Sequence, residues 1–377
     1  QDLGISAAAY GFGAGLFFVG YFLFGLPSNM ILARLGARKW IATILFVWGL
    51  ISTSTMFVHN ATELYIIRFL LGAAEAGFYP GIIYYLDHWF PIMAKARAFS
   101  YFHMSLAISM CIGNVVSGLI LGMDGLAGLT GWQWVFLCEG IPAVLCSVVA
   151  YKVLLDSPRD VHWLTAEEKD WLIEKLSSER ATKEMGSASL WDVCKKPQVW
   201  HFAAIYTTLN IGFYGILFWL PQIVKSMAGT NDMVTSILSA IPWITAIIVM
   251  GIVAGYADRS PKKKKFIAVP IFIGALGLLA GTYFHNLPVL ALACLSLSTA
   301  CCECPVGPFW TLPSRIFDGL TGAAAIAIIN AIGNLGGFFG PYLFGLVSTG
   351  NNYNMGFIVL ASMMILSSAL AMLVKEK

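Results

Sequence analysis

Long apolar runs alternate with short polar and basic stretches along almost the whole chain. Eleven of these runs are long enough to cross a bilayer as helices, which takes about 20 residues each. We predict membrane-spanning helices near residues 6–32, 40–58, 63–86, 97–121, 133–155, 199–224, 234–257, 266–284, 288–311, 321–348 and 354–374. This pattern is typical of an all-α polytopic membrane protein.

One polar segment, residues 156–197, separates the fifth predicted span from the sixth. Within it, the stretch Thr165–Glu179 predicts an N-capped amphipathic helix. The segment divides the chain into an N-terminal bundle of five spans (1–155), a cytoplasmic central segment (156–197) and a C-terminal bundle of six spans (198–377).

Composition agrees with a membrane protein. Of the 377 residues, 58% are hydrophobic and 11% are charged, whereas a soluble domain carries about 25% charged residues. The net charge of +3 comes from basic residues spread over loops, so no nucleic-acid partner is expected.

The positions of the basic residues predict the orientation. With the first loop in the cytoplasm, every Lys and Arg except Arg68 and Lys225 lies on the cytoplasmic side. We expect a protein of the inner (plasma) membrane with a cytoplasmic C-terminus. The run Lys262–Lys265 is expected to act only as an anchor at anionic lipid headgroups.

Eight cysteines are present, and three of them lie in the stretch Cys301–Cys304, which reads CCEC. Adjacent cysteines on a helix point in different directions, and no histidine lies nearby. We therefore predict no metal site and no cofactor, and we interpret these cysteines as small buried side chains.

Arg68 and Glu75 interrupt the apolar run 64–85 with charge. A charge at the centre of a membrane helix costs about 2.5–3.5 kcal/mol on insertion scales, so this pair needs an explanation. The two residues are seven positions apart, about two helical turns, and project from one face. They either form a site that binds an anion at Arg68 and a proton at Glu75, or they form a structural ion pair between helices.

Three motifs recur along the chain at nearly one offset. EAGFYP (75–80) corresponds to ECPVGP (303–308), ARLGARK (33–39) to ADRSPKKKK (257–265), and IGNVVSG (112–118) to IGNLGGF (332–338). The order and spacing predict an internal duplication. The sixth span then has no partner before residue 1, so we expect a twelve-helix protein whose first helix is missing from this chain.

Several stretches carry a recognisable family signature. They are GLPSNMILARLGARKW (25–40), RFLLGAAEAGFYPG (68–81), WFP (89–91) with KARA (95–98), WVFLCEGIPA (134–143), PFWTLPSRIFDG (308–319) and AIAIINAIGNLGGFFGPYLFG (325–345). In these stretches the chain resembles the major facilitator superfamily, in its anion:cation symporter branch. It is similar to bacterial proton-coupled transporters of sugar acids and hydroxy acids such as rhamnonate, galactonate and tartrate. The resemblance implies the major facilitator fold, two six-helix bundles with 11 of 12 helices present.

The resemblance also implies roles for site residues. In such transporters an arginine and a glutamate on the fourth helix line the cavity, and the glutamate couples transport to protons. Arg68 and Glu75 match this pair. Tyr21, Trp310 and Asn330 match a tyrosine, a tryptophan and an asparagine that contact the substrate.

The two basic loops match the loops that latch such transporters during conformational change. Arg34 and Arg38 lie in the first loop, and Asp258 and Arg259 lie in its copy. The first loop has Ala33 where the superfamily usually has an aspartate, so we expect the latch to be asymmetric.

Four further polar residues are candidates for the site. The repeat places Glu303 opposite Glu75, so Glu303 is a second candidate for proton coupling. His103 carries an imidazole, which suits a proton relay, although a packing histidine is more common at such a position. Asn210 and Tyr214 lie four apart and could bind substrate hydroxyl groups or join helices.

These observations predict a secondary active transporter that imports a small organic anion with protons by alternating access. Its partners are that anion, protons and the lipid bilayer, and we expect a monomer. We find no nucleotide-binding motif and no catalytic constellation, so we do not expect an enzyme. The alternative is a transport-incompetent sensor or scaffold derived from such a transporter.

Overall fold

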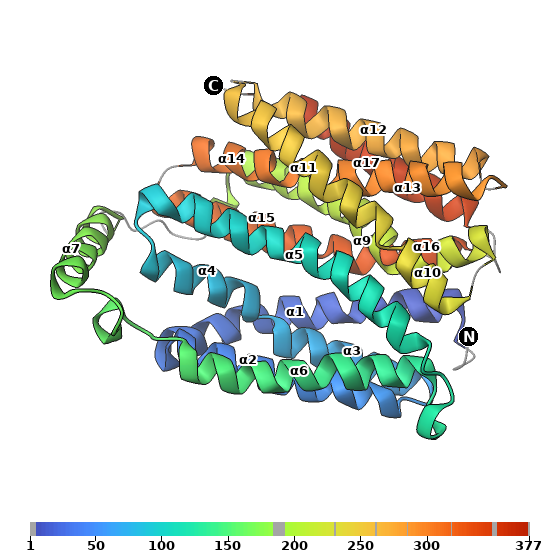
Figure 1. Ribbon diagram of the computed structural model, residues 1–377. Coiled ribbons are helices and arrows are strands. Elements are labelled where there is room, and N and C mark those ends of the chain that lie inside the picture. Colours follow the sequence, from blue (N-terminus) through green and yellow to red (C-terminus); the bar gives the residue numbers. More distant parts are fainter. Residues whose placement is uncertain are drawn as a thin grey trace. The chain divides into compact units, whose positions relative to one another are not determined.

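A computed structural model describes residues 5–183, 193–229, 231–260, 262–284, 286–317, 319–348 and 353–375. Within these ranges the regular structure is helical throughout, and consecutive helices follow one another through short connections (Figure 1). The helices are α1 (Ala7–Leu35), α2 (Ala37–Ser54), α3 (Ala61–Glu75), α4 (Phe78–Trp89), α5 (Ile92–Leu121), α6 (Gly131–Val153), α7 (Ala166–Lys183), α9 (Pro197–Ala228), α10 (Asp232–Leu238), α11 (Ile241–Arg259), α12 (Lys263–Tyr283), α13 (Pro288–Glu303), α14 (Val306–Ile316), α15 (Gly319–Asn334), α16 (Gly336–Val347) and α17 (Asn354–Met372).

The described residues contain ten stretches of helix that are long and apolar enough to cross a membrane. Each of them overlaps one of the eleven predicted spans. The remaining predicted span, 97–121, falls in α5, whose described apolar part is Ile108–Leu121. The all-α polytopic fold predicted from the apolar runs is confirmed.

Four spans that were predicted as single helices are interrupted, which corrects the sequence-based expectation. The breaks separate α3 from α4, α10 from α11, α13 from α14, and α15 from α16. Pro80 and Pro308 each occupy the third position after their break, and proline lacks the N–H that would continue the helical ladder. Proline therefore favours a new helix start at these positions.

The helix boundaries support the predicted duplication. Helices α1, α2, α3, α5 and α6 begin 225, 226, 227, 227 and 223 residues before α10, α12, α13, α15 and α17. The match between IGNVVSG (112–118) and IGNLGGF (332–338), in contrast, does not agree with the helix boundaries. Asn114 lies seven residues before the end of α5, whereas Asn334 lies thirteen residues before the end of α16, so that motif does not mark equivalent depths.

By internal contacts the chain divides into two compact units, and α1 and α5 contribute residues to both. One unit consists of Val19–Leu106 and Asp124–Ser187. In it, α2 packs along α6 and also contacts α3 and α4. A Cβ atom at Gly140 of α6 would lie 2.2 Å from Oγ1 of Thr53, so this small residue permits the close approach of the two backbones.

The other unit consists of Gln1–Phe18, Ala107–Met123 and Ala188–Lys377. Helix α9 is central to its packing and contacts α13, α15, α16 and α17. Its core includes the fully buried side chains of Trp219, Phe309 and Phe344. A Cβ atom at Gly340 of α16 would lie 2.4 Å from the carbonyl oxygen of Ile211, so α16 and α9 also meet backbone to backbone. The predicted bundles 1–155 and 198–377 stay a prediction.

Helix α7 lies in the central segment and begins with a side-chain cap, whereas its amphipathic character stays a prediction. The backbone N–H of Glu168 donates to Oγ1 of Thr165 at 3.3 Å, and the Thr165 N–H donates to Oε2 of Glu168 at 2.9 Å. This reciprocal pair is a capping box. The Thr165 amide holds the pKa of the Glu168 carboxyl below its ordinary value, because its hydrogen bond favours the ionised form.

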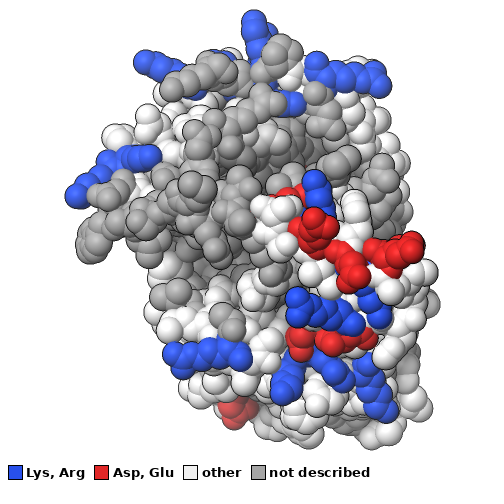
Figure 2. Space-filling model, turned by 90° about the vertical axis from the view of Figure 1, so that its left-hand side faces the viewer, with Lys and Arg blue, Asp and Glu red and all other residues white. Residues whose placement is uncertain are grey.

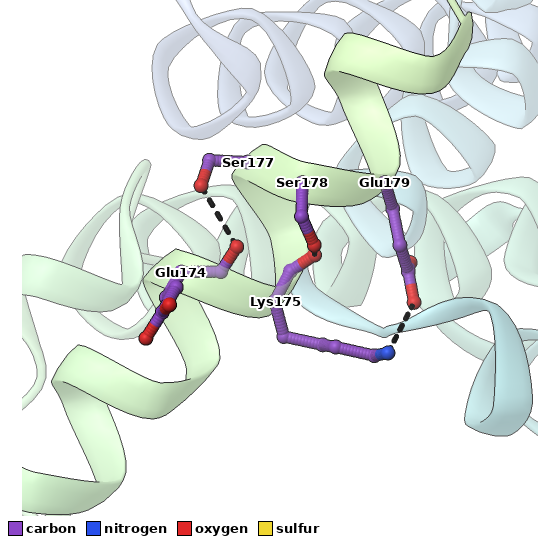
Figure 3. Close-up of polar contacts among 5 residues, drawn as sticks. All are labelled: Glu174, Lys175, Ser177, Ser178 and Glu179. Carbon is purple, nitrogen blue, oxygen red and sulfur yellow. Dashed lines mark hydrogen bonds and ion pairs between the residues drawn. The ribbon is translucent and has the colours of Figure 1, made fainter.

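On the face of the molecule shown in Figure 2, Lys and Arg are widely spread, whereas Asp and Glu gather mainly on one side next to further basic residues. Along α7, Lys175 and Glu179 form an i,i+4 ion pair at 3.9 Å, and the hydroxyl of Ser177 donates to the Glu174 carbonyl at 2.8 Å (Figure 3). The Ser178 hydroxyl makes the same kind of bond to the Lys175 carbonyl. Exposed contacts of this kind add little stability each.

Candidate functional site

Arg68 and Glu75 both lie on α3, and Glu75 is its last residue. Both side chains are half-buried. Within the described part of the chain, neither side chain makes a hydrogen bond or an ion pair. The described residues therefore show no ion pair between Arg68 and Glu75, and their role as a site stays a prediction.

The end of α3 is fixed by a contact that the sequence analysis did not single out. Ser28 of α1 accepts a hydrogen bond from Nε1 of Trp40 at 3.0 Å, and its hydroxyl lies against Gly77 in the break after Glu75. A Cβ atom at Gly77 would lie 1.8 Å from Oγ of Ser28. Helices α1 and α2 thus hold the break in place, and with it the carboxylate that ends α3. The only sequence signal was that Ser28 and Trp40 belong to one motif, 25–40.

Glu303 occupies the same place in the second repeat. It is the last residue of α13, with Cys304 and Pro305 in the break before α14. Its side chain is buried, whereas that of Glu75 is half-buried. In the described residues Glu303 has no hydrogen-bond or ion-pair partner. The structure therefore places a carboxylate at the end of an interrupted helix in each unit.

Helix α9 carries Tyr206, Asn210 and Tyr214 at intervals of four, which places them along one side of the helix. Asn210 is buried, and its Nδ2 donates to the carbonyl oxygen of Gly333 on α15 at 3.0 Å. This bond joins α9 to α15, which is the helix-joining role weighed above. Tyr214 packs on the ring of Phe18, with centroids 4.5 Å apart.

Trp310 of α14 belongs to an aromatic group with Tyr206 and Phe309. Its ring centroid lies 5.0 Å from that of Tyr206 and 5.1 Å from that of Phe309, which is fully buried. Tyr206 was missed by the sequence analysis, although its spacing from Asn210 was a usable signal. Asn330 of α15 accepts a hydrogen bond through Oδ1 from Asn334 at 3.3 Å, which leaves its N–H groups to donate.

Two predicted site residues lie on α1 and α5. Tyr21 is half-buried on α1. His103 lies on α5, and its side chain is outside the described residues.

The first basic loop is hydrogen-bonded to the carboxylate of Asp156, which lies far away in the sequence. Arg38, the second residue of α2, donates its backbone N–H to Oδ1 of Asp156 at 2.9 Å, and its Nε to the carbonyl of Tyr151 at 2.6 Å. Gly36 precedes α2 with φ +83°, a conformation that favours glycine. A carboxylate at this helix N-terminus is stabilised by the unpaired amides and the helix dipole. Arg34 is exposed at the end of α1.

The second basic loop corrects the expectation for the lysine run. Lys263 is buried, and its Nζ donates to the carbonyl of Ala257 in the last turn of α11. Nζ of Lys264 reaches the carbonyls of Met372 and Val374 at 3.4 and 3.3 Å. These lysines thus bond to carbonyls at the ends of α11 and α17, and the Ala257 carbonyl also accepts the Ser260 N–H at 3.1 Å. Of the predicted loop residues in this copy, Arg259 is exposed at the end of α11, and the side chain of Asp258 lies outside the described residues.

Comparison with known proteins gives one family. The family model described as Major Facilitator Superfamily matches residues 1–324. The chain is 40% identical to a quinolone resistance transporter of Acinetobacter baumannii, covering 93% of this chain and 81% of that protein. It is 38% identical to a protein of Agrobacterium vitis named for tartrate transport, covering 99% of this chain and 83% of that protein.

Solved structures show the same fold at low sequence identity. The inward-open xylose transporter XylE of Escherichia coli superposes with a TM-score of 0.78 at 17% identity, covering 100% of this chain and 88% of that chain. At this identity the likeness concerns the fold alone.

Proposed function

The chain belongs to the major facilitator superfamily, and from this premise we propose that it imports a small organic anion together with protons by alternating access. The proposal extends to a multi-pass protein of the inner membrane, monomeric and with its C-terminus in the cytoplasm. The orientation rests on the distribution of Lys and Arg over the loops.

The observation that carries the proposal is that Arg68 and Glu75 lie on one helix and have no hydrogen-bond or ion-pair partner among the described residues. A charged side chain held inside a membrane helix without a partner is costly, and such residues usually mark a substrate or proton path. Arg68 can hold a carboxylate through two parallel N–H···O bonds. Glu75, two turns further along α3, can take up a proton.

The two groups give a physical basis for coupling. When Glu75 carries a proton, the site no longer holds an isolated negative charge, and an anion bound at Arg68 is then the only counter-charge. When the site holds both the anion and the proton, its charges are balanced. Its desolvation penalty in low-dielectric surroundings is then smaller than that of an unpaired arginine or carboxylate. We propose that Glu303 offers a second protonation site of the same kind, and that the basic loops with Arg34, Arg38, Asp258 and Arg259 act as the latch.

Uncharged groups would then select the substrate. Trp310 offers a face for the carbon skeleton, and the N–H groups of Asn330 can donate to hydroxyl or carboxylate oxygens. We assign the same kind of role to Tyr21, Tyr214 and His103, and to the Oδ1 atom of Asn210. Tartrate, named for one relative, is a hydroxylated dicarboxylate and fits this chemistry.

Uptake into proteoliposomes tests the proposal. With a proton gradient imposed, labelled tartrate and sugar acids are offered to the wild type and to Glu75→Gln. We expect the wild type to accumulate an acid and Glu75→Gln to lose accumulation while retaining exchange of acid across the membrane. Unchanged accumulation by Glu75→Gln would remove the proposed proton role.

Two controls complete the experiment. Arg68→Lys keeps the charge but lacks the planar fork, so it should weaken acid binding while leaving the protein folded. A quinolone is included because one relative is named for quinolone resistance. If no acid and no quinolone moves, the alternative of a sensor or scaffold replaces the proposal.

A further inference from the structure

The glutamates that end α3 and α13 have different neighbours. In the first repeat, residues 73–76 read AAEA, and in the second, residues 301–304 read CCEC. At the common offset of 228, every alanine that flanks Glu75 is replaced by a cysteine around Glu303. The small alanine side chain fills these positions beside Glu75. The second repeat differs by having a sulfur atom at each of them.

Two of these three cysteines lie on one side of the helix. Cys301 and Cys304 lie three residues apart in one helical turn, and the Cys304 N–H still donates to the Ala300 carbonyl at 3.0 Å. Helix geometry places their Cα atoms about 5 Å apart, which lies within the roughly 4.4–6.8 Å that a disulfide requires. The third, Cys302, turns instead toward α17, with Sγ 3.9 Å from Sδ of Met364.

The surroundings leave limited room for chemistry at this pair. Gly274 of α12 lies beside Cys301, where a Cβ atom would come within 3.0 Å of the Cys301 Cβ. The side chains of Cys301 and Cys304 are only 5% and 4% exposed. A reagent that reaches them must therefore be small and uncharged.

The backbone at Cys301 and Cys304 lacks two hydrogen bonds that a continuous helix would have. The residues four positions after Cys301 and Cys304 are Pro305 and Pro308. Proline has no N–H, so the carbonyl of each cysteine lacks the donor that an unbroken helix would supply. The joint between α13 and α14 is therefore held by fewer hydrogen bonds, and it directly follows Glu303.

We propose that Cys301 and Cys304 are a site of reversible covalent modification, in which a small uncharged two-electron oxidant converts them to a disulfide. The two S–H bonds break and one S–S bond forms. An azo compound takes up the two electrons and two protons and becomes a hydrazine, or a small disulfide is reduced to its thiols. The new bond ties Cys304, the first residue of the joint, to the last turn of α13, so it stiffens the start of the joint beside Glu303.

Mass spectrometry tests the modification without reference to transport. The protein in liposomes is treated with the azo oxidant diamide, and the remaining thiols are then alkylated. We expect the peptide with Cys301–Cys304 to lose the mass of two hydrogen atoms, and a phosphine reductant to reverse the loss. Cys301→Ala and Cys304→Ala should each abolish it, whereas the matched control Cys302→Ala should keep it.

The alanine variants copy residues of the first repeat, so they are compatible with the fold. A wild type that forms no disulfide overturns the proposal. The same holds if Cys302→Ala abolishes the disulfide as Cys304→Ala does, because the pairing would then not be the one assigned.

The effect of the disulfide on the joint between α13 and α14 is measured separately, by acid uptake. This part of the inference rests on the proposed function. Diamide should abolish acid uptake by the wild type and by Cys302→Ala, restored on reduction, and leave Cys304→Ala unaffected. If the disulfide forms and uptake continues, the joint does not control transport. If Glu75→Gln accumulates acid normally, the proposed proton coupling fails whether or not the disulfide forms.

Discussion

The contact between Ser28 and Gly77 allows a quantitative test of how the break after Glu75 is held. In Gly77→Ala, the new Cβ atom would lie 1.8 Å from Oγ and 2.9 Å from Cβ of Ser28, whereas non-bonded heavy atoms are most stable at about 3.5–4.0 Å. Ser28 cannot simply turn away, because its hydroxyl accepts the bond from Trp40. One of the two helices must shift.

Overpacking of this kind costs about 1–3 kcal/mol. Replacing glycine by alanine also stabilises the folded state by about 0.4–1 kcal/mol, because it lowers the conformational entropy of the unfolded chain. The φ of −96° at Gly77 suits both residues. We therefore expect Gly77→Ala to destabilise the protein by about 1–2 kcal/mol and to lower the melting temperature by about 1–3 °C. Acid uptake should fall as well, because Glu75 moves with the break.

Intrinsic tryptophan fluorescence in detergent follows the unfolding, and two variants serve as controls. Gly25 of α1 has no atom within 4 Å of the position of a Cβ, so Gly25→Ala should be neutral or stabilising. In a Ser28→Gly background the Gly77→Ala step should cost markedly less. If Gly77→Ala melts like Gly25→Ala, or if its cost is the same with and without Ser28, the packing argument is wrong.

Three further predictions follow from individual contacts. Asp156→Ala should cost about 1 kcal/mol and speed hydrogen exchange in the first turn of α2, because the amide of Arg38 loses its acceptor; unchanged exchange there would contradict the assignment. Asn210→Ala should cost about 1–3 kcal/mol in a chemical-denaturation series, because a buried carbonyl on α15 is left without a donor, and a neutral effect would show that water replaces it. The Glu168 carboxylate caps α7 only when ionised, and its lowered pKa means that this stabilisation is present at neutral pH and is lost as the pH falls through that pKa. Exchange protection of α7 should therefore exceed that of Glu168→Gln at pH 7, and the difference should vanish only once the pH falls below the lowered pKa of Glu168.

Much of the architecture was predictable from local pattern. Apolar runs of bilayer length give the spans because the backbone must be satisfied within a helix when no water is present. The spacing of Arg68 and Glu75 places them on one face for the same local reason, and the repeat pointed to Glu303 as the second carboxylate. Pro80 and Pro308 also marked possible helix breaks in the sequence. The prediction used only the length of the apolar runs, so it gave continuous helices where the structure has breaks.

Contacts between distant segments were not predictable. Asp156 reaches the N-terminus of α2 across 118 positions of sequence, and nothing in either stretch identifies the other. Asn210 was open to two interpretations because only the position of α15 shows what its amide contacts. Lys263 and Lys264 matched a generic membrane anchor, and their helix-capping bonds depend on how α11 and α17 end nearby.

The bond between Arg38 and Asp156 also has a consequence for protein engineering. The acidic partner of the α1–α2 loop is encoded more than a hundred codons downstream, so the loop is not a self-contained cassette. A chimera that grafts this loop from a relative with its own aspartate would place two carboxylates at one helix start. Recombination libraries built from such parents should therefore exchange the loop and the α6 terminus together.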